Sequence, residues 1–471
     1  MKKTKIICSI GPASQDVEVM AKMVEAGMDV ARINFSHGNY EEYSYIVNSV
    51  KKARELSREN IAIMYDTKGP DFRCGEIEET GINLVPGGNV RILKEKVIGK
   101  ENYFSVNHAE ALDMINVGNN ILLEDGLMKL EVVSKEADGI TCKVIQGGVL
   151  KSKKGVKVPG VELNLPFMSE EDVKDIEFAC KNDGDFIALS FVESAENVRQ
   201  VRELLKQNER EDMKIISKVE SKAGVDNLLE IIEASDGIMV ARGDLGVEVP
   251  IEKLPVIQKD MIRLCRENER FVIVATEMLS SMAKSIRPTR AEVTDVSNAV
   301  FDGADAVMLS GETTVGEHPI EAIRYMAKIC EDSEQNDIYT TKFTYKSNND
   351  ITEAIANAVL SSLKQLDIKA IVVPTSGGHS PTVISNLRPD TMILAPCPSE
   401  AVARGLLLNY GVYPVVVLNV KDDDMDDAVR HAKNVAINIL GLKEKDKIII
   451  TGGIHNNLAV KQTNFMKIEE I

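Results

Sequence analysis

Short runs of apolar, largely β-branched residues recur along the first two-thirds of the chain. Segments of helical periodicity, such as 16–26 and 197–208, lie between most of them. Because the runs are apolar on both faces and alternate with helices, they predict parallel strands covered by helices. The runs occupy residues 5–8, 30–33, 61–65, 186–189, 214–217, 238–241, 272–275 and 306–309.

Eight successive strand–helix units favour a closed (β/α)8 TIM barrel over an open doubly wound sheet, which is the alternative. We therefore predict an α/β chain whose A domain is such a barrel, built from residues 1–69 and 166–345.

Between Tyr65 and Phe186 the pattern changes to short strands and glycine-rich turns, and regular helices are scarce. We predict that residues 70–165 form a small β-barrel domain (B) inserted after the third strand, with Pro70 and Pro166 near its two hinges. At that end of the barrel the insertion would serve as a lid over the catalytic face. Its strand-like runs are 90–93, 120–123, 129–133 and 141–145.

The last part of the chain, residues 346–471, predicts a separate α/β domain (C) behind a polar linker at 331–350. Its expected helices are 352–365 and 425–440. Its expected strands are 370–373, 392–395, 415–418 and 447–450.

The charge balance limits the class of partner. The 471 residues include 56 Lys and Arg and 73 Asp and Glu, a formal net charge of −17. This argues against nucleic acid or an anionic membrane as main partner, but a small phosphorylated molecule needs only local positive charge. Seven scattered cysteines without a C-x-x-C suggest neither disulfides nor zinc. Without a signal peptide or a long apolar stretch, a cytoplasmic location is expected.

Polar and charged residues follow most of the predicted strands at their C-terminal ends, which in a barrel meet at one rim. For any single residue the alternative is a solvated strand end or a structural ion pair. These residues are Arg32, Asn34, Ser36, His37, Asp66, Thr67, Lys218, Glu220, Arg242, Gly243, Asp244, Thr276, Glu277, Ser310 and Glu312.

The residue types at this rim indicate phosphoryl chemistry. Glu220 and Asp244 are suited to a hard divalent cation that also takes substrate oxygens. Lys218 and Arg32 supply positive charge for a phosphoryl group in transfer. Four further oxygen-bearing residues suit a monovalent cation, the alternative being a hydrogen-bonded turn. They are Asn34, Ser36, Asp66 and Thr67.

Eight motifs carry a resemblance that extends from end to end. They are TKIICSIGPAS (4–14), MDVARINFSHG (28–38), DTKGP (66–70), SKKGVKVPG (152–160), IISKVES (215–221), IMVARGDLGVEVP (238–250), RPTRAEVTDVSNAV (287–300) and VMLSGETTVGEHP (307–319). With these motifs the chain resembles the pyruvate kinase family. The resemblance implies phosphoryl transfer from phosphoenolpyruvate to ADP, giving pyruvate and ATP in the last step of glycolysis. It further implies dependence on Mg²⁺ (or Mn²⁺) and K⁺, and a homotetramer.

The resemblance also implies roles for individual residues, position by position. The catalytic residues are Lys218, Arg32 and Thr276. The substrate-binding residues are Arg32, Lys218, Gly243, Asp244 and Thr276. The nucleotide-binding residues are Asn34, His37, Arg73 and Lys154. The divalent-metal ligands are Glu220 and Asp244, and the potassium ligands are Asn34, Ser36, Asp66 and Thr67. Asp125 is similar to a lid aspartate, and Ser310 and Glu312 to a path that protonates the enolate.

The chain departs from the family pattern at several positions. Glu277 replaces the usual Gln, and Glu193 replaces the usual Arg. Lys157 replaces the usual Asn, and Asn164 replaces the usual Asp. Asp71 stands where potassium-dependent members carry Glu and independent ones Lys, so we expect a potassium requirement. The alternative is that Asp71 only caps a turn.

The loop after strand 370–373 is a candidate cradle for an effector phosphate, since hydroxyls, N–H groups and a helix N-terminus converge there. The alternative is a helix-capping loop that binds no ligand. We expect fructose-1,6-bisphosphate to be the effector no more than any other phosphorylated compound, because the loop at 452–460 lacks the later glycines typical of family members that respond to it. The cradle residues are Thr375, Ser376, Gly377, Gly378 and Ser380.

Two other functions compete with the phosphotransferase. A metal-dependent barrel lyase or aldolase acting on pyruvate enolates shares the acidic pair but lacks the lid and the potassium motif. A catalytically silent relative is expected to have lost Lys218, Glu220 or Asp244, and all three are present.

Overall fold

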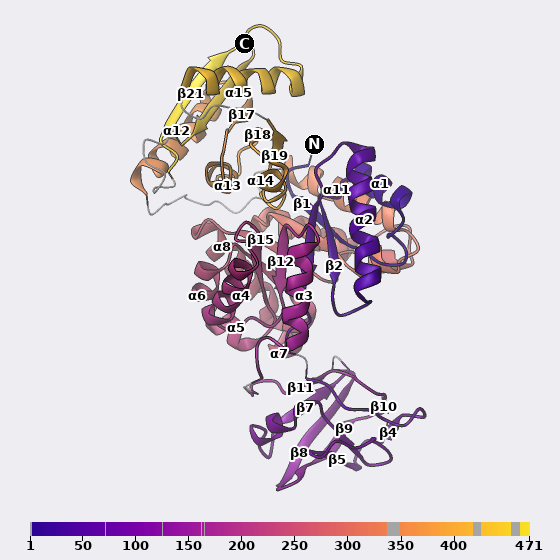
Figure 1. Cartoon of the computed structure of the whole chain (residues 1–471). Helices are drawn as coiled ribbons and strands as arrows, with labels where there is room; N and C mark the ends of the chain where they lie inside the picture. The colour runs from indigo at the N-terminus through magenta and orange to yellow at the C-terminus, as the bar shows by residue number, and fades with distance from the viewer. Residues whose placement is uncertain are drawn as a thin grey trace.

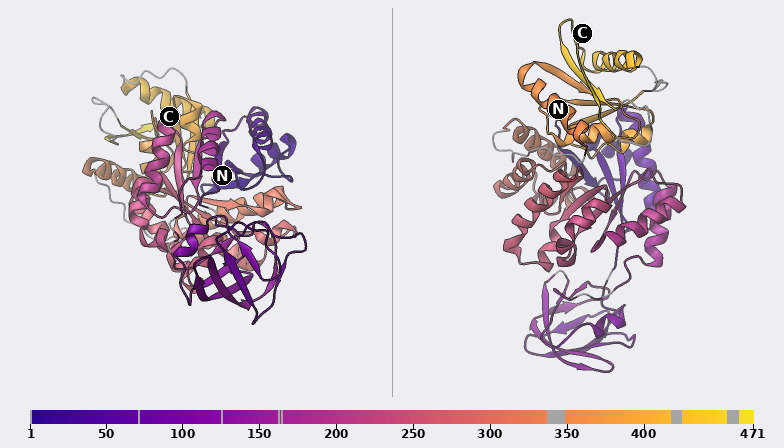
Figure 2. Two further views of the ribbon diagram at one scale, coloured as in Figure 1. Left: turned by 60° about the horizontal axis from the view of Figure 1, so that its bottom comes forward. Right: turned by 90° about the vertical axis from the view of Figure 1, so that its left-hand side faces the viewer.

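The computed structural model describes residues 2–70, 72–124, 126–161, 163, 165–336, 349–417, 425–453 and 462–471. The barrel lies between the two smaller parts, the inserted β domain at one end and the C-terminal domain at the other (Figures 1 and 2). In these described ranges no helix has the length and apolar character needed to cross a membrane.

Eight parallel strands close into a barrel in the order β1-β16-β15-β14-β13-β12-β3-β2, which confirms the predicted TIM barrel. Each strand lies within about two residues of a predicted run, the usual accuracy of sequence-based boundaries. The strands are β1 (Lys5–Ser9), β2 (Val30–Asn34), β3 (Ala62–Asp66), β12 (Phe186–Leu189), β13 (Lys214–Val219), β14 (Gly237–Ala241), β15 (Phe271–Ala275) and β16 (Ala306–Leu309).

Helices cover the outside of the barrel, and three of them begin with capping boxes: Ser169 with Asp172, Ser194 with Asn197, and Thr289 with Glu292. The helices are α1 (Val17–Ala26), α2 (Tyr40–Ser57), α3 (Glu170–Lys181), α4 (Ala195–Gln207), α5 (Lys222–Asp226), α6 (Leu228–Ala234), α7 (Arg242–Glu248), α8 (Leu254–Glu267), α9 (Arg290–Asp302), α10 (Gly311–Thr314) and α11 (Pro319–Glu334). Two short 3-10 helices, η2 (Ile251–Lys253) and η3 (Ser280–Ala283), accompany them.

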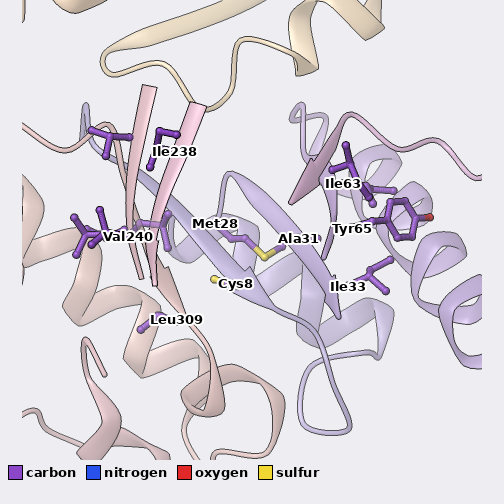
Figure 3. Close-up of a cluster of buried hydrophobic side chains, with 14 of the residues drawn as sticks. Cys8, Met28, Ala31, Ile33, Ile63, Tyr65, Ile238, Val240 and Leu309 are labelled. Carbon is purple, nitrogen blue, oxygen red and sulfur yellow. The ribbon is translucent and has the colours of Figure 1, made fainter. Parts of the chain in front are cut away.

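The barrel strands bury both faces, which explains their unbroken apolar sequence. Along β1, Ile6 and Cys8 pack against the surrounding helices, whereas Ile7 packs inside the barrel. Figure 3 shows part of the outer layer, where Ala31 and Ile33 of β2 lie with Cys8 among other buried side chains. Both layers are almost entirely closed to solvent.

The inserted domain has its own apolar core and consists almost wholly of strands. Its hydrogen-bonded strands form an open six-stranded sheet, β11-β7-β8-β9-β5-β6, and a separate β10-β4 pair. The small barrel expected from the sequence is thus two sheets around one core. The elements are β4 (Ile82–Leu84), β5 (Asn89–Leu93), β6 (Tyr103–Ser105), η1 (Ala109–Asp113), β7 (Asn120–Leu123), β8 (Met128–Glu136), β9 (Gly139–Gln146), β10 (Gly148–Leu150) and β11 (Val156–Lys157).

The C-terminal domain is a five-stranded sheet with the order β19-β18-β17-β20-β21 and apolar cores on both faces. The predicted linker begins too early, because α11 continues to Glu334, and residues 337–348 lie outside the described ranges. The antiparallel edge strand β21 was not predicted. The elements are α12 (Asp350–Gln365), β17 (Ile368–Val372), α13 (His379–Asn386), β18 (Ile393–Cys397), α14 (Glu400–Arg404), β19 (Val412–Val416), α15 (Met425–Leu440), β20 (Lys447–Gly452) and β21 (Phe465–Glu470).

The C-terminal domain closes the barrel at the N-terminal ends of its strands. Leu407 and Leu408 pack into the apolar interior of the barrel. Lys5, at the start of β1, is buried there, donates to the Val412 carbonyl at 2.6 Å, and has its pKa lowered to about 8 by burial. This end of the barrel is therefore covered, and the predicted site residues lie at the opposite rim.

Removing the cation of a buried ion pair across this junction is expected to destabilise the protein. Arg388 Nη1 lies 2.8 Å from Asp305 Oδ1, and both side chains are less than a tenth exposed. Arg388→Ala leaves Asp305 without this partner, and we expect the free energy of unfolding to fall by about 3 kcal/mol, measured by calorimetry. Arg324→Ala removes an exposed pair with Glu321 and serves as the control, with little expected change.

Candidate active site

The C-terminal ends of the barrel strands bring the predicted rim residues together. The strand register places Ser9 beside Arg32 and Asn34 beside Asp66, and the next strand pairs Ala188 with Asp66. Residues distant in sequence therefore share one rim, as the strand-end pattern predicts.

Asp66 is the centre of a buried charge network. Its Oδ2 accepts from Arg32 Nε at 2.7 Å, and its Oδ1 lies 3.1 Å from Lys218 Nζ. Burial pushes the pKa of Asp66 upward, but the charges of Arg32 and Lys218 outweigh it and hold that pKa below the ordinary value. Ser9 Oγ accepts a further bond from Arg32 at 2.6 Å, which fixes the guanidinium from the other side.

Lys218 is a second enclosed cation of the rim, with a side chain that is 12% exposed. Its Nζ donates to Ser190 Oγ at 2.7 Å and lies 3.0 Å from Glu220 Oε1. Burial disfavours its charge, but Asp66 and Glu220 together raise its pKa to about 12. An ammonium of such pKa keeps its charge throughout the neutral range.

Glu220 and Asp244 follow neighbouring strands and differ in environment. Glu220 is buried, accepts the Phe191 N–H at 2.9 Å, and has its pKa raised mainly by that burial. The Asp244 side chain is 39% exposed and is therefore partly open to solvent. A pair of carboxylates beside an open face fits Mg²⁺, which keeps waters and takes substrate oxygens. In the described part of the chain no group of three or more His, Cys, Asp and Glu residues gathers into a larger metal site.

One residue of the inserted domain reaches this pair. Lys157, on β11, places its Nζ 2.5 Å from Asp244 Oδ1 on α7. The same Nζ lies 5.7 Å from the centroid of the Phe191 ring. Figure 1 shows β11 and α7 at the junction between the inserted domain and the barrel.

Gly243 and Thr276, two of the expected substrate-binding residues, lie in direct contact. The Gly243 N–H donates to Thr276 Oγ1 at 2.9 Å. Thr276 has a left-handed backbone with φ 68°, which costs a β-branched residue free energy. Arg242 stabilises this turn, because its guanidinium donates to the Thr276 carbonyl at 2.6 Å and pairs with Asp295.

The proposed potassium ligands lie at the ends of β2 and β3. Asn34 Oδ1 accepts the Ser36 N–H at 3.0 Å, and Ser36 is exposed. Thr67 is buried, and its carbonyl accepts from Ser190 Oγ at 2.7 Å. Asp71, on which the sequence argument for potassium depends, lies outside the described residues.

The expected nucleotide contacts are divided between the barrel and the inserted domain. His37 is exposed beside Asn34 on the barrel rim. Arg73 and Lys154 belong to adjoining segments of the inserted domain, where Cys74 N donates to the Lys154 carbonyl at 2.9 Å. Lys154 Nζ pairs with Glu124 at 2.6 Å. The predicted lid aspartate Asp125 and the departure Asn164 lie outside the described residues.

Sequence reasoning overlooked Ser9 and Ser190, which bind the two central cations. Each stands at the C-terminal end of a predicted strand, so a complete survey of strand ends would have included both. Glu312 is buried and accepts the N–H groups of Ser310 and Leu279, and it thereby joins two rim loops. Glu277 is exposed.

The candidate effector loop lies in the C-terminal domain. The Gly378 N–H donates to Thr375 Oγ1 at 2.8 Å, and Ser380 Oγ accepts from Thr463 Oγ1 at 2.9 Å. Ser376 and Gly377 are exposed at the tip of the turn. Residues 454–461 of the neighbouring loop lie outside the described residues.

Comparison with known proteins gives one consistent result. Residues 1–323 match the family described as pyruvate kinase, barrel domain, and residues 353–469 match pyruvate kinase, alpha/beta domain. A pyruvate kinase of Geobacillus stearothermophilus is 44% identical over 478 residues, covering 100% of this chain and 80% of the relative. A pyruvate kinase of Bacillus licheniformis is 42% identical over 475 residues, covering 99% of this chain and 80% of the relative. The crystal structure of a pyruvate kinase from Cryptosporidium parvum matches with a TM-score of 0.91 at 35% identity, covering 100% of this chain and 96% of that one.

Replacing Asp66 is expected to weaken the fold in a pH-dependent manner. Because its pKa is lowered, the stability that Asp66 contributes is complete above its ordinary pKa of 3.8 and is lost as the pH falls through the folded-state value. Asp66→Asn leaves Arg32 and Lys218 without their shared anion, and we expect a loss of about 3 kcal/mol at neutral pH.

Denaturant unfolding between pH 3 and pH 8 measures this difference. We expect the gap between wild type and Asp66→Asn to be constant above about pH 4 and to shrink below it. Asp138→Asn removes an exposed pair with Arg91 and is expected to leave stability nearly unchanged. A gap that persisted undiminished at low pH would contradict the assigned ion pairs.

Proposed function

The chain belongs to the pyruvate kinase family, and on this basis we propose that its barrel rim transfers the phosphoryl group of phosphoenolpyruvate to ADP. Membership makes the chain a phosphotransferase of glycolysis. The alternative of a metal-dependent lyase or aldolase receives no support from the comparisons.

The observation that carries this proposal is the buried sequence of alternating charges Arg32–Asp66–Lys218–Glu220. Transfer of a phosphoryl group depends mostly on positioning and on neutralising the charge of its oxygens. Arg32 binds the phosphate of phosphoenolpyruvate, and Lys218 neutralises the phosphoryl group between donor and acceptor. Both cations are held before substrate arrives, so little reorganisation is needed during reaction.

The pyruvate carboxylate binds at the turn after β15. The Gly243 N–H and the Thr276 hydroxyl, 2.9 Å apart, exchange their mutual hydrogen bond for bonds to the carboxylate. Arg242 keeps the Thr276 backbone in place through its bond to the carbonyl. This anchor orients the enol oxygen toward Lys218.

The Glu220 and Asp244 carboxylates fit a divalent cation, Mg²⁺ or Mn²⁺. When bound, the ion neutralises phosphoryl oxygens and orients them. Asp244 offers it an exposed oxygen, while Glu220 is fixed by the Phe191 N–H.

ADP binds between the rim and the inserted domain. His37 and Asn34 contact it from the barrel, and Arg73 and Lys154 contact it from the insertion. In this proposal residues 70–165 act as a lid that excludes water when the nucleotide is bound. The separate apolar core of this domain supports motion as one body.

Regulation is proposed for the C-terminal domain. A phosphorylated effector binds the turn formed by Thr375–Ser380, whose exposed tip and helix N-terminus suit a phosphate. We further propose that the functional unit is a homotetramer, as the family resemblance implies.

The role of Lys218 is tested by Lys218→Met. Loss of its charge is expected to cut turnover by several orders of magnitude, because one positioned charge is worth roughly 3 kcal/mol or more of barrier. Turnover is measured in a coupled assay with ADP and phosphoenolpyruvate, and binding of phosphoenolpyruvate is measured by calorimetry in the presence of Mn²⁺ and is expected to remain close to wild type.

Lys222→Met is the matched control, since Lys222 follows the same strand but is exposed and paired with Asp226. It is expected to turn over like wild type. If Lys218→Met retained more than about a tenth of the turnover, the catalytic role of Lys218 would be wrong.

Turnover is expected to require potassium. Asn34, Ser36, Asp66 and Thr67 supply oxygens at two adjacent strand ends. With Mg²⁺ in tetramethylammonium salt we expect almost no activity, and full activity when K⁺ is added at constant ionic strength. Ser36→Ala is expected to raise the K⁺ concentration for half-maximal rate several-fold. Full activity without any monovalent metal would overturn this assignment, and an Asp71→Lys variant active without K⁺ would be its strongest support.

A further inference from the structure

The contact between Lys157 and Asp244 crosses from the lid to the barrel and is not part of the function proposed above. Lys157 lies on β11 in the lid, and its side chain is only 14% exposed. Its ammonium lies 2.5 Å from the Asp244 carboxylate, which is the open member of the divalent pair. A lid residue therefore neutralises the carboxylate that is assigned to a metal ion.

The surroundings of this ammonium are strongly acidic. Glu248 lies one helical turn beyond Asp244 on α7, so the two carboxylates share a face of the helix. Burial raises the pKa of Glu248, while Lys157 lowers it and Glu193 and Asp244 raise it. Asp244 and Glu193 repel the Glu248 carboxylate, and Lys157 attracts both Asp244 and Glu248.

An ammonium and a divalent ion cannot both occupy the same side of one carboxylate oxygen. Binding of the ion at Asp244 requires the Lys157 ammonium to withdraw from that carboxylate. Since Lys157 is fixed to β11, whose backbone pairs with Leu122 of β7, withdrawal displaces the lid strand.

We propose that Lys157 competes with the divalent cation for Asp244 and thereby couples metal binding to release of the lid. The inference rests on the proposed assignment of Glu220 and Asp244 as divalent ligands. By thermodynamic linkage, whatever holds the lid in this contact weakens metal binding, and metal binding loosens the contact by the same factor.

The test is the affinity of the full chain for Mn²⁺ without substrates, measured by electron paramagnetic resonance of the free ion at constant ionic strength. Lys157→Gln is expected to bind Mn²⁺ about fivefold or more tightly than wild type, within the usual range of coupling between sites. Lys157→Arg keeps the positive charge and is expected to bind like wild type.

Lys153→Gln is the charge-matched control. Lys153 belongs to the same lid, and its exposed side chain pairs with Glu76. It removes the same unit of charge, so it separates the contact with Asp244 from the general field of the lid. We expect its Mn²⁺ affinity to equal that of wild type.

Asp244→Asn distinguishes the failure of this inference from the failure of the metal assignment. If Asp244→Asn loses Mn²⁺ binding but Lys157→Gln binds no more tightly than wild type, the competition is refuted and the metal assignment stands. If Asp244→Asn binds Mn²⁺ like wild type, both are refuted.

Hydrogen exchange measures the coupling to the lid independently of metal affinity. In wild type, Mn²⁺ is expected to speed amide exchange in peptides that cover β11. In Lys157→Gln this exchange is expected to be fast already and to respond little to Mn²⁺. Equal protection of β11 in the two proteins without metal would overturn the coupling.

Discussion

The carboxylate of Asp66 lies between two cations, Arg32 and Lys218, and the geometry of the rim depends on that arrangement. Each of these charges would be costly to bury alone, because desolvation of an unpaired ion is worth several kcal/mol. Together they satisfy one another and extend to Glu220 through Lys218. The network fixes the positions of Arg32 and Lys218, the two cations that the proposed function assigns to the phosphoryl group.

The barrel separates this charge network from the contacts that hold the domains together. At the N-terminal ends of the strands, Leu407 and Leu408 close the interior and Lys5 binds the carbonyl of Val412. At the C-terminal ends, the loops carry the residues proposed to bind substrate and metal. A parallel barrel makes this division possible because all of its strands end on the same side.

The inserted domain adds a further ion pair at the rim. Lys157 brings positive charge to Asp244, and its neighbour Glu248 supplies a second anion on the same helix face. Lys218 of the barrel and Lys157 of the inserted domain therefore both bring positive charge to the rim. In the proposed function, motion of the inserted domain would change the charge at Asp244, a proposed metal ligand, and would link the position of that domain to metal binding.

The sequence by itself determined the barrel, because strands buried on both faces leave continuous apolar runs that alternate with helices. It also determined the residue types at the rim, since strand ends are identified once the strands are. The family motifs then suggested individual roles. Element boundaries shifted where local signals are weak: α11 extends into the predicted linker, and the half-exposed edge strand β21 has no strong apolar run.

Only the tertiary structure decided which partners each charged group has. The sequence contains Ser9 and Ser190 as ordinary polar residues, and their bonds to Arg32 and Lys218 depend on strands that are distant along the chain. The pairing of Lys157 with Asp244 joins residues 87 positions apart in two domains. Electrostatic contacts of this kind follow from where the closed barrel and the lid bring the backbone, because no local periodicity records them.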